Sequence, residues 1–181
     1  RELAPAVDDC TLRIERRSEE SIRVERDAVL PLRTSESLGA MVTIRHRGGL
    51  GYAATSDLSR AGLARAIEQG GAWAERSAER MVPGFPQAAP LTVEADYRAP
   101  ERQPWSSIPL ADRVAMLVDA SRRLKIDERI LDWGAAFWSI DKEQLHLSAA
   151  GARIAQRFHY LQPTLHAAAN SGGETQRRSF G

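Results

Sequence analysis

The sequence predicts an α+β fold in which a mainly antiparallel or mixed β-sheet carries two helices packed on one face. Three observations predict it: segments with alternating apolar residues come first, two segments with helical periodicity follow, and strand-like segments return at the end. We expect strands within about 11–55, helices at about 59–80 and 109–125, and strands within about 129–180. No long linker divides the 181 residues, so we expect a single domain over 1–181.

The first segment alternates apolar and charged residues, as a half-buried strand does. Leu12 and Ile14 form one apolar pair, and Ile22 and Val24 form another. The polar run at 16–20 separates the two pairs, so we expect it to be the turn of a hairpin.

Gly48 and Gly49 predict a tight turn between a strand at 39–45 and a strand at 50–54. Glycines can also mark a phosphate-binding loop, but the spacing here matches neither GxxxxGK[ST] nor GxGxxG, and a strand follows instead of a helix. A structural turn is therefore the favoured interpretation.

Both predicted helices have a recognisable start and a buried stripe. Side-chain oxygens at 56–59 can cap the first helix, which Gly70 and Gly71 should weaken or bend. Its expected stripe is Leu63, Ile67, Gly70, Ala74 and Ala78. Pro109 can occupy the first turn of the second helix. Its expected stripe is Leu110, Val114, Leu117, Ser121 and Leu124.

The remaining segments are expected to be irregular or extended. The proline-rich stretch 81–105 predicts an irregular and mobile crossing between the helices. After the second helix, the polar run 141–143 predicts a hairpin turn, and Pro163 should interrupt the strands that follow Gly151.

Composition excludes several classes of protein. The chain carries 25 basic and 24 acidic side chains, which argues against nucleic acid as the main partner. It has no apolar run of the roughly 18 residues that a spanning helix needs, so we expect no membrane partner. A single cysteine excludes an internal disulfide and favours the cytoplasm.

The residues that could bind a metal or act in catalysis do not form a convincing site. The four histidines, His46, His146, His159 and His166, make no HExxH pattern, so we expect surface or hydrogen-bonded histidines. Cys10 lies beside Asp8 and Asp9, whose negative charge should raise the pKa of the thiol and suppress the thiolate.

Paired carboxylates and a group of aromatic residues are the remaining candidates. Glu19 and Glu20, like Asp8 and Asp9, should be solvated in polar turns and not poised for acid–base chemistry. An aromatic group could form a ligand platform, although core packing or an interface explains it more simply. That group is Trp133, Phe137 and Trp138.

Three segments, taken in order, resemble the opening domain of TldD/PmbA proteins. They are 13–25, with charged and serine residues on a strand; 38–45, with a glycine and Val42 on a strand; and 51–59, ending in Asp57-Leu58-Ser59 before an alanine-rich helix. The later helix, the strand hairpins and the polar run 170–174 resemble the TldD branch more than the PmbA branch.

The resemblance implies a zinc-dependent metallopeptidase, known as a modulator of DNA gyrase, that acts on small or unfolded peptides. In that family the metal-binding histidines and catalytic glutamate lie on a helix in the C-terminal half, with a cysteine ligand downstream. We therefore expect an N-terminal fragment that is not catalytic alone, with no catalytic, cofactor-binding or metal residue of its own and zinc in the full-length protein. The expected partners are its own C-terminal domain, a paralogous subunit in a homo- or hetero-oligomer, and a peptide substrate.

Two alternatives to the active peptidase stay open. The chain could belong to the inactive paired subunit, or it could be a stand-alone binding module of the gyrase-modulator type. A stand-alone module predicts a free sheet edge that can add a peptide strand.

Overall fold

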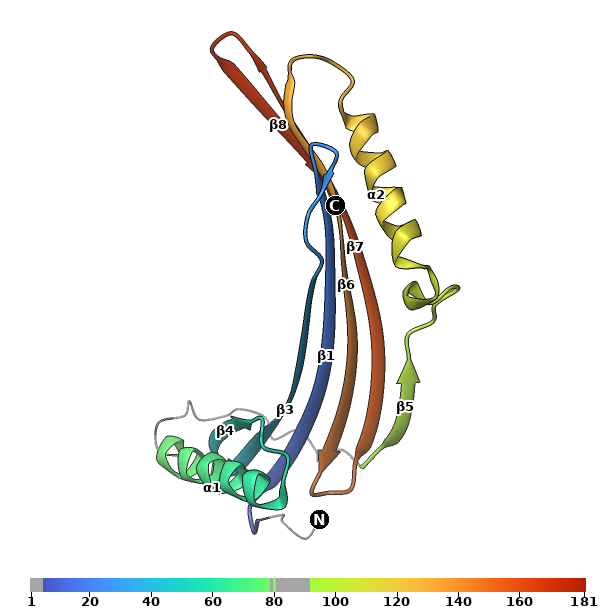
Figure 1. Ribbon diagram of the computed structural model, residues 1–181. Coiled ribbons are helices and arrows are strands. Elements are labelled where there is room, and N and C mark those ends of the chain that lie inside the picture. Colours follow the sequence, from blue (N-terminus) through green and yellow to red (C-terminus); the bar gives the residue numbers. More distant parts are fainter. Residues whose placement is uncertain (1–4, 79, 81–91) are drawn as a thin grey trace. The chain divides into compact units, whose positions relative to one another are not determined.

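A computed structural model describes residues 5–78, 80 and 92–181 (Figure 1). In chain order the elements are β1 (Asp9–Glu25), β2 (Ala28–Val29), β3 (Arg33–His46), β4 (Gly49–Thr55), α1 (Arg60–Ser77), β5 (Glu94–Arg98), a 3-10 turn η1 (Trp105–Ser107), α2 (Leu110–Leu124), β6 (Ile130–Ser148), β7 (Arg153–Ser171) and β8 (Glu174–Phe180). These described elements, a sheet with two α-helices, confirm the predicted α+β class.

The sheet is mixed but mainly antiparallel. Its strands lie in the order β4, β3, β1, β6, β7, β5, with β2 pairing with β1 and β8 pairing with β7. The pairs β1–β2, β3–β4 and β7–β8 are antiparallel, whereas β5 pairs with β7 in parallel. The β3–β4 turn contains Arg47 and Gly48, both with positive φ, so the hairpin predicted around Gly48 and Gly49 is confirmed.

The chain forms two compact units, each with its own core. The first comprises 1–17, 37–99 and 142–158, and the second comprises 18–36, 100–141 and 159–181. Each of the long strands β1, β3, β6 and β7 contributes residues to both units. The expectation of one domain over 1–181 stays a prediction.

Two predicted turns are wrong, because the chain continues through them as strand. β1 runs through 16–20 and β6 through 141–143. The polar residues there pair with neighbouring segments: Glu20 with Arg113, and Asp141 with His159. A polar run on a strand is stable when its side chains find such partners, so the run does not need a turn.

Pro163 also lies inside a strand, contrary to the expected interruption. It falls between the part of β7 that pairs with β5, which ends at Arg157, and the part that pairs with β8, which begins at Leu165. A missing N–H is tolerated at such a position because no ladder bond to those two strands is lost.

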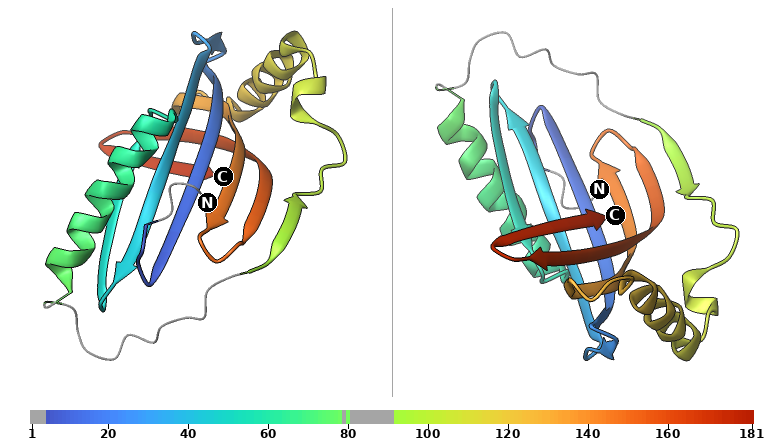
Figure 2. Two further views of the ribbon diagram at one scale, coloured as in Figure 1. Left: turned by 90° about the horizontal axis from the view of Figure 1, so that it is seen from below. Right: turned by 90° about the horizontal axis from the view of Figure 1, so that it is seen from above.

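α1 lies against β4 in the first unit (Figure 2). The core there combines Val42 and Ile44 with the small residues Ala53, Ala66 and Ala74. Ser59 caps the helix by accepting a hydrogen bond from the Gly62 amide at 3.1 Å. The buried stripe is Gly62, Ala66, Gly70 and Ala74. In the first two turns the buried positions lie one residue earlier than predicted. Leu63 and Ile67 are therefore only partly buried.

Glycines in β4 bring the backbone of α1 onto the sheet. A Cβ on Gly51 would lie 2.0 Å from the Gly70 carbonyl oxygen, and one on Gly49 would lie 1.9 Å from the Ala74 carbonyl oxygen. The predicted weakening at Gly70 and Gly71 produces no break, since α1 is continuous. Small residues are required here because any side chain would push the helix away.

The second unit packs larger side chains under α2. Leu117 is 2% exposed and packs with Ile22, Val24 and Ala135. Ser121 is also buried, as predicted, whereas Leu110 in the first helical turn is 42% exposed and falls outside the stripe. Pro109 serves as the N-cap residue, just before the first turn.

The proline-rich segment is only partly described. Residues 81–91, on which the prediction of mobility falls, lie outside the described residues. Further along, 94–98 form β5 and 105–107 form η1, so this part is more regular than expected. The parallel register of β5 with β7, from Glu94 opposite Arg153 onward, accounts for its strand conformation.

Candidate functional site

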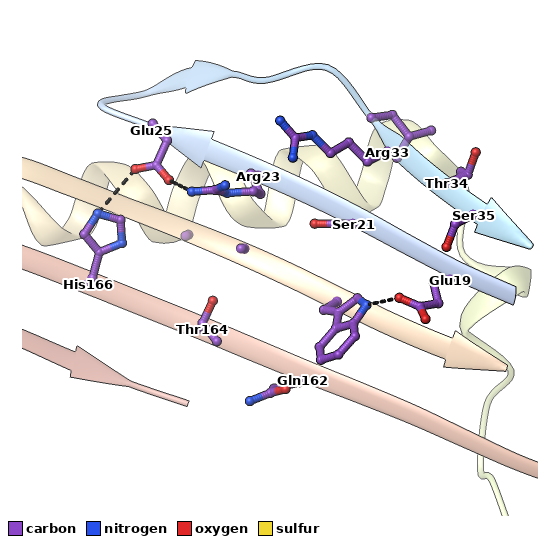
Figure 3. Close-up of a pocket in the computed structure, with 14 residues that line it drawn as sticks. Glu19, Ser21, Arg23, Glu25, Arg33, Thr34, Ser35, Gln162, Thr164 and His166 are labelled. Carbon is purple, nitrogen blue, oxygen red and sulfur yellow. Dashed lines mark hydrogen bonds and ion pairs between the residues drawn. The ribbon is translucent and has the colours of Figure 1, made fainter. Parts of the chain in front are cut away.

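A groove of about 900 Å3 lies on the sheet of the second unit. Side chains along β1 point alternately to the two faces of the sheet. Ile22 and Val24 pack in the core with α2, so the residues between them face the other side and form the floor of the groove. Four β1 side chains therefore line the groove, namely Glu19, Ser21, Arg23 and Glu25 (Figure 3).

Neighbouring strands complete the groove in the same way. β7 contributes Gln162, Thr164 and His166, while Leu165 between them packs in the core. β6 contributes Trp138, which is 40% exposed. The start of β3 contributes Arg33, Thr34 and Ser35. The lining thus combines neutral hydrogen-bonding groups, both signs of charge and one large aromatic ring.

Neighbouring side chains hold two carboxylates of the groove in place. Arg23 Nη2 lies 2.7 Å from Glu25 Oε1 (Figure 3). Trp138 donates through Nε1 to Glu19 Oε2 at 3.1 Å. These contacts fix the carboxylates against the floor, so the groove has a defined pattern of charge.

One histidine lies between two carboxylates. His166 Nε2 is 3.3 Å from Glu25 Oε2 and 3.5 Å from Asp132 Oδ2. The Glu25 contact is drawn in Figure 3. Gly134 lies beside them, and a Cβ there would be 2.4 Å from Glu25 Oε2 and 2.6 Å from the His166 ring. The absence of a side chain at Gly134 is therefore what lets Glu25 and His166 meet.

The other three histidines each have a different environment. His159 Nδ1 is 2.7 Å from Asp141, and His46 Nδ1 is 3.9 Å from Asp8. His146 Nε2 is buried without a hydrogen-bond partner among the described residues. Over that same part of the chain, the one group of three residues that could hold a metal ion is Glu25, Asp132 and His166.

Cys10 is buried in the core of the first unit and is 7% exposed. Burial raises the pKa of the Cys10 thiol, and the charge of Asp9 adds to the rise. The predicted direction is therefore confirmed, although burial contributes more than the neighbouring charge.

Of the two pairs of carboxylates, Glu19 and Glu20 do not lie in a solvated turn, whereas Asp8 is exposed in a bend before β1. Glu19 and Glu20 are strand residues of β1, and Glu20 accepts hydrogen bonds from Arg113 and from Trp105 Nε1, the latter at 3.4 Å. The prediction of a turn is wrong because residues distant in sequence supply their partners. Asp8, in contrast, accepts a bond from the Arg47 amide at 2.7 Å.

The three candidate aromatics separate into different roles. Phe137 packs edge-on against Trp105, with ring centroids 4.9 Å apart. Trp133 donates to Asp27 at 3.1 Å, and Trp138 lines the groove. They form no common platform: Phe137 and Trp138 are adjacent on β6 and face opposite sides, while Trp133 lies four residues before Phe137 and bonds to Asp27.

The sequence did not predict the contacts that shape the second unit, because the residues that make them lie far apart in the chain. Ser121 donates to Asp27 at 2.8 Å, a contact that spans 94 positions of the chain. The bonds from Ser121 and Trp133 hold the pKa of Asp27 below its usual range. Gly134 in a run of strand residues was the one readable signal, because an isolated strand glycine often marks a close approach.

Solved structures with a similar fold include the following three. A candidate modulator of DNA gyrase from Thermotoga maritima has 12% identity and a TM-score of 0.69, covering 94% of this chain and 38% of that one. Another from Bacteroides thetaiotaomicron has 16% identity and a TM-score of 0.70, covering 96% and 39%. TldE from Thermococcus kodakarensis has 15% identity and a TM-score of 0.64, also covering 96% and 39%.

The chain therefore spans well under half the length of the structures it matches, and it has the α+β fold found in gyrase-modulator proteins and TldE. Residues 10–78 match the family described as PmbA/TldA metallopeptidase domain 1. That match confirms the resemblance to the first domain of the PmbA/TldD family. The closer likeness to the TldD branch stays a prediction. No curated protein matches the chain.

Within the part of the chain that the structure describes, the helices α1 and α2 fit neither a histidine-bearing zinc site nor a membrane span. Neither α1 nor α2 contains a histidine, so neither fits the histidine-bearing helix that the resemblance implies for zinc. Among the described residues, no helix combines the length and apolar character needed to cross a membrane.

Proposed function

We propose that this chain is the N-terminal, non-catalytic part of a TldD/PmbA-type zinc metallopeptidase that acts on small or unfolded peptides. In this proposal the catalytic metal is bound by a part of the protein beyond residue 181, and the groove of the second unit holds the peptide chain. The match of residues 10–78 to the first domain of the family supports the assignment. The groove is the main observation that supports a peptide-holding role.

The chemistry of the groove suits an extended peptide of variable sequence. Hydroxyl and amide groups of Ser21, Thr164 and Gln162 can bond to peptide backbone groups, which every sequence presents. Trp138 offers an apolar surface for a side chain. Such a lining would bind chains by shared backbone features and would discriminate weakly among side chains.

An open strand edge at the rim of the groove supports the same role. β3 pairs with β4 only from Ala40 to His46, and its other neighbour in the sheet is β1. Within the described pairings, residues 33–39 therefore have a partner strand on one side only. Arg33, Thr34 and Ser35 belong to this edge and also line the groove. An added peptide strand could bond to that edge.

Binding of a fluorescein-labelled, unstructured peptide, followed by fluorescence anisotropy, tests the groove. Trp138→Ala removes the exposed ring, so it should weaken binding by about tenfold or more. Trp73→Ala is the matched control, because Trp73 is an exposed tryptophan on α1 in the first unit. Equal affinity in all variants would contradict the peptide-holding role.

A cleavage assay tests the non-catalytic role separately. The 181-residue chain should leave an unfolded peptide intact in the presence of Zn2+, whereas a longer protein that continues beyond residue 181 should cleave it. Cleavage by the 181-residue chain would contradict the proposal, whatever the result of the binding assay.

The stand-alone peptide-binding module is the second candidate, and the open β3 edge favours it as much as the first. Membership of the inactive paired subunit is the third. The coding sequence after residue 181 separates them: a stop favours the module, a histidine-bearing metal helix favours the active subunit, and a related domain lacking that helix favours the inactive one. For the peptidase subunits we propose a cytoplasmic location and assembly with a paralogous subunit.

A further inference from the structure

We propose that Glu25, Asp132 and His166 bind one divalent transition-metal ion of the zinc class at the end of the groove in the second unit. This site is separate from the catalytic zinc proposed beyond residue 181. Its ligands come from β1, β6 and β7, which are consecutive strands of the sheet. Ligands on adjacent strands are held by the sheet itself, so the site would be rigid.

The distances between the ligand atoms suit such an ion. Around a tetrahedral zinc with bonds of about 2.0–2.1 Å, neighbouring ligand atoms lie about 3.3–3.4 Å apart. His166 Nε2 is 3.3 Å from Glu25 Oε2 and 3.5 Å from Asp132 Oδ2, and all three ligand atoms lie within 4.8 Å of one another. Small side-chain rotations would therefore be enough to complete the coordination.

Surrounding groups prepare the ligands for this role. Arg23 binds Glu25 through Oε1, which leaves Oε2 directed at His166. Gly134 supplies the space, since a Cβ there would fall 2.4 Å from Glu25 Oε2. An arginine that orients a carboxylate ligand is the kind of outer contact that metal sites use. These two features point to a cluster with room for an ion and with a fixed ligand geometry.

The ligand types decide the class of metal. An imidazole nitrogen with two carboxylate oxygens suits zinc and its first-row neighbours, whereas magnesium and calcium favour sites made of oxygen alone. Three protein ligands leave a fourth position for water or for an oxygen of a molecule in the groove. Glu25 and His166 both line that groove, which gives the ion a route from solvent.

Titration of the metal-free 181-residue chain with Zn2+ by isothermal calorimetry tests the site. We expect one ion per chain, and Co2+ in place of Zn2+ should give the visible absorption of a four-coordinate ion. His166→Gln and Asp132→Asn should each weaken Zn2+ binding by about tenfold or more. His159→Gln is the matched control, because His159 is another β7 histidine paired with a carboxylate, and it should change nothing.

Circular dichroism checks that each variant folds. If His166→Gln does not fold, the test uses Asp132→Asn instead. The Asp132 side chain is half-exposed, so its replacement should disturb the fold less. Absence of stoichiometric binding, or equal weakening by His159→Gln, would overturn the proposal and show that His166 is only ion-paired to the carboxylates. Peptide affinity in the Trp138→Ala variant is measured without metal, so failure of this site leaves the proposed peptide groove unaffected.

Discussion

The two units place a helix on a sheet by opposite means. In the first unit, glycines and alanines let the backbone of α1 approach β4 closely. In the second, α2 packs through Leu117 and its neighbours, and Ser121 adds a hydrogen bond to Asp27. Packing in the first unit requires that Gly49 and Gly51 carry no side chain, whereas packing in the second unit requires the buried side chain of Leu117. An added methyl group should therefore damage the first unit most, and a deleted side chain the second.

The largest effect is expected from adding one methyl group to the first unit. In Gly51→Ala the new Cβ would lie 2.0 Å from the Gly70 carbonyl oxygen and 2.4 Å from the Ala74 nitrogen, so α1 would have to move. We expect a loss of more than about 3 kcal/mol in urea unfolding. Gly173→Ala, with nothing within 4 Å of its Cβ, should change stability by less than about 0.5 kcal/mol. Similar values for both variants would contradict close helix–sheet packing.

In the second unit, removing a buried side chain should have the next largest effect. Leu117→Ala would leave a cavity between α2 and the sheet, with an expected loss of about 3 kcal/mol in the same assay. Its neighbour Met116 is 50% exposed, so Met116→Ala should cost less than about 1 kcal/mol. A small loss for Leu117→Ala would mean that α2 contributes little to this core.

A hydroxyl group accounts for the third expected effect. Ser121→Ala removes the bonds that Ser121 makes to the β1–β2 turn, at an expected cost of about 1 kcal/mol at pH 7. The bond to the Asp27 carboxylate lowers the pKa of Asp27, so its contribution is present above about pH 4 and is lost as the pH falls through the lowered pKa.

Stability measured from pH 7 to pH 2 should therefore decline less in Ser121→Ala than in the parent chain. Ser107→Ala, which removes a hydroxyl that bonds to the nearby Pro104 carbonyl, should retain the full decline. Parallel curves for the parent and Ser121→Ala would show that Asp27 is not the group responsible.

The smallest effect concerns Cys10, whose rate of chemical modification measures how well the core of the first unit is buried, without any substitution. Because burial raises the pKa of this thiol, iodoacetamide at pH 7.5 should modify it about tenfold or more slowly than the unfolded chain. A raised pKa also means that the contribution of the thiol to stability is present below its unfolded pKa and declines at higher pH. Rapid modification of the folded chain, followed by mass spectrometry, would contradict the burial of Cys10.

Local pattern predicted those elements whose signals lie within a few residues. Ser59 as a cap, the turn at Gly48 and the helix around Leu117 each depend on neighbours three or four positions away. The buried stripe of α1 differs from the predicted one because small residues occupy its most buried positions, whereas the larger Leu63 and Ile67 are only partly buried. Hydrophobicity alone does not reveal this, since it ranks a leucine above a glycine at a buried position.

The amino-acid sequence by itself determined the α+β class, the two helices and the resemblance to the first domain of the PmbA/TldD family. Only the tertiary structure decided that the polar runs at 16–20 and 141–143 are strand, and that Glu25 and His166 meet beside Gly134. The physical reason is the distance along the chain over which each contact acts. A turn or a cap is stabilised by adjacent residues, whereas a groove on a sheet is formed by side chains that come together only when distant strands pair.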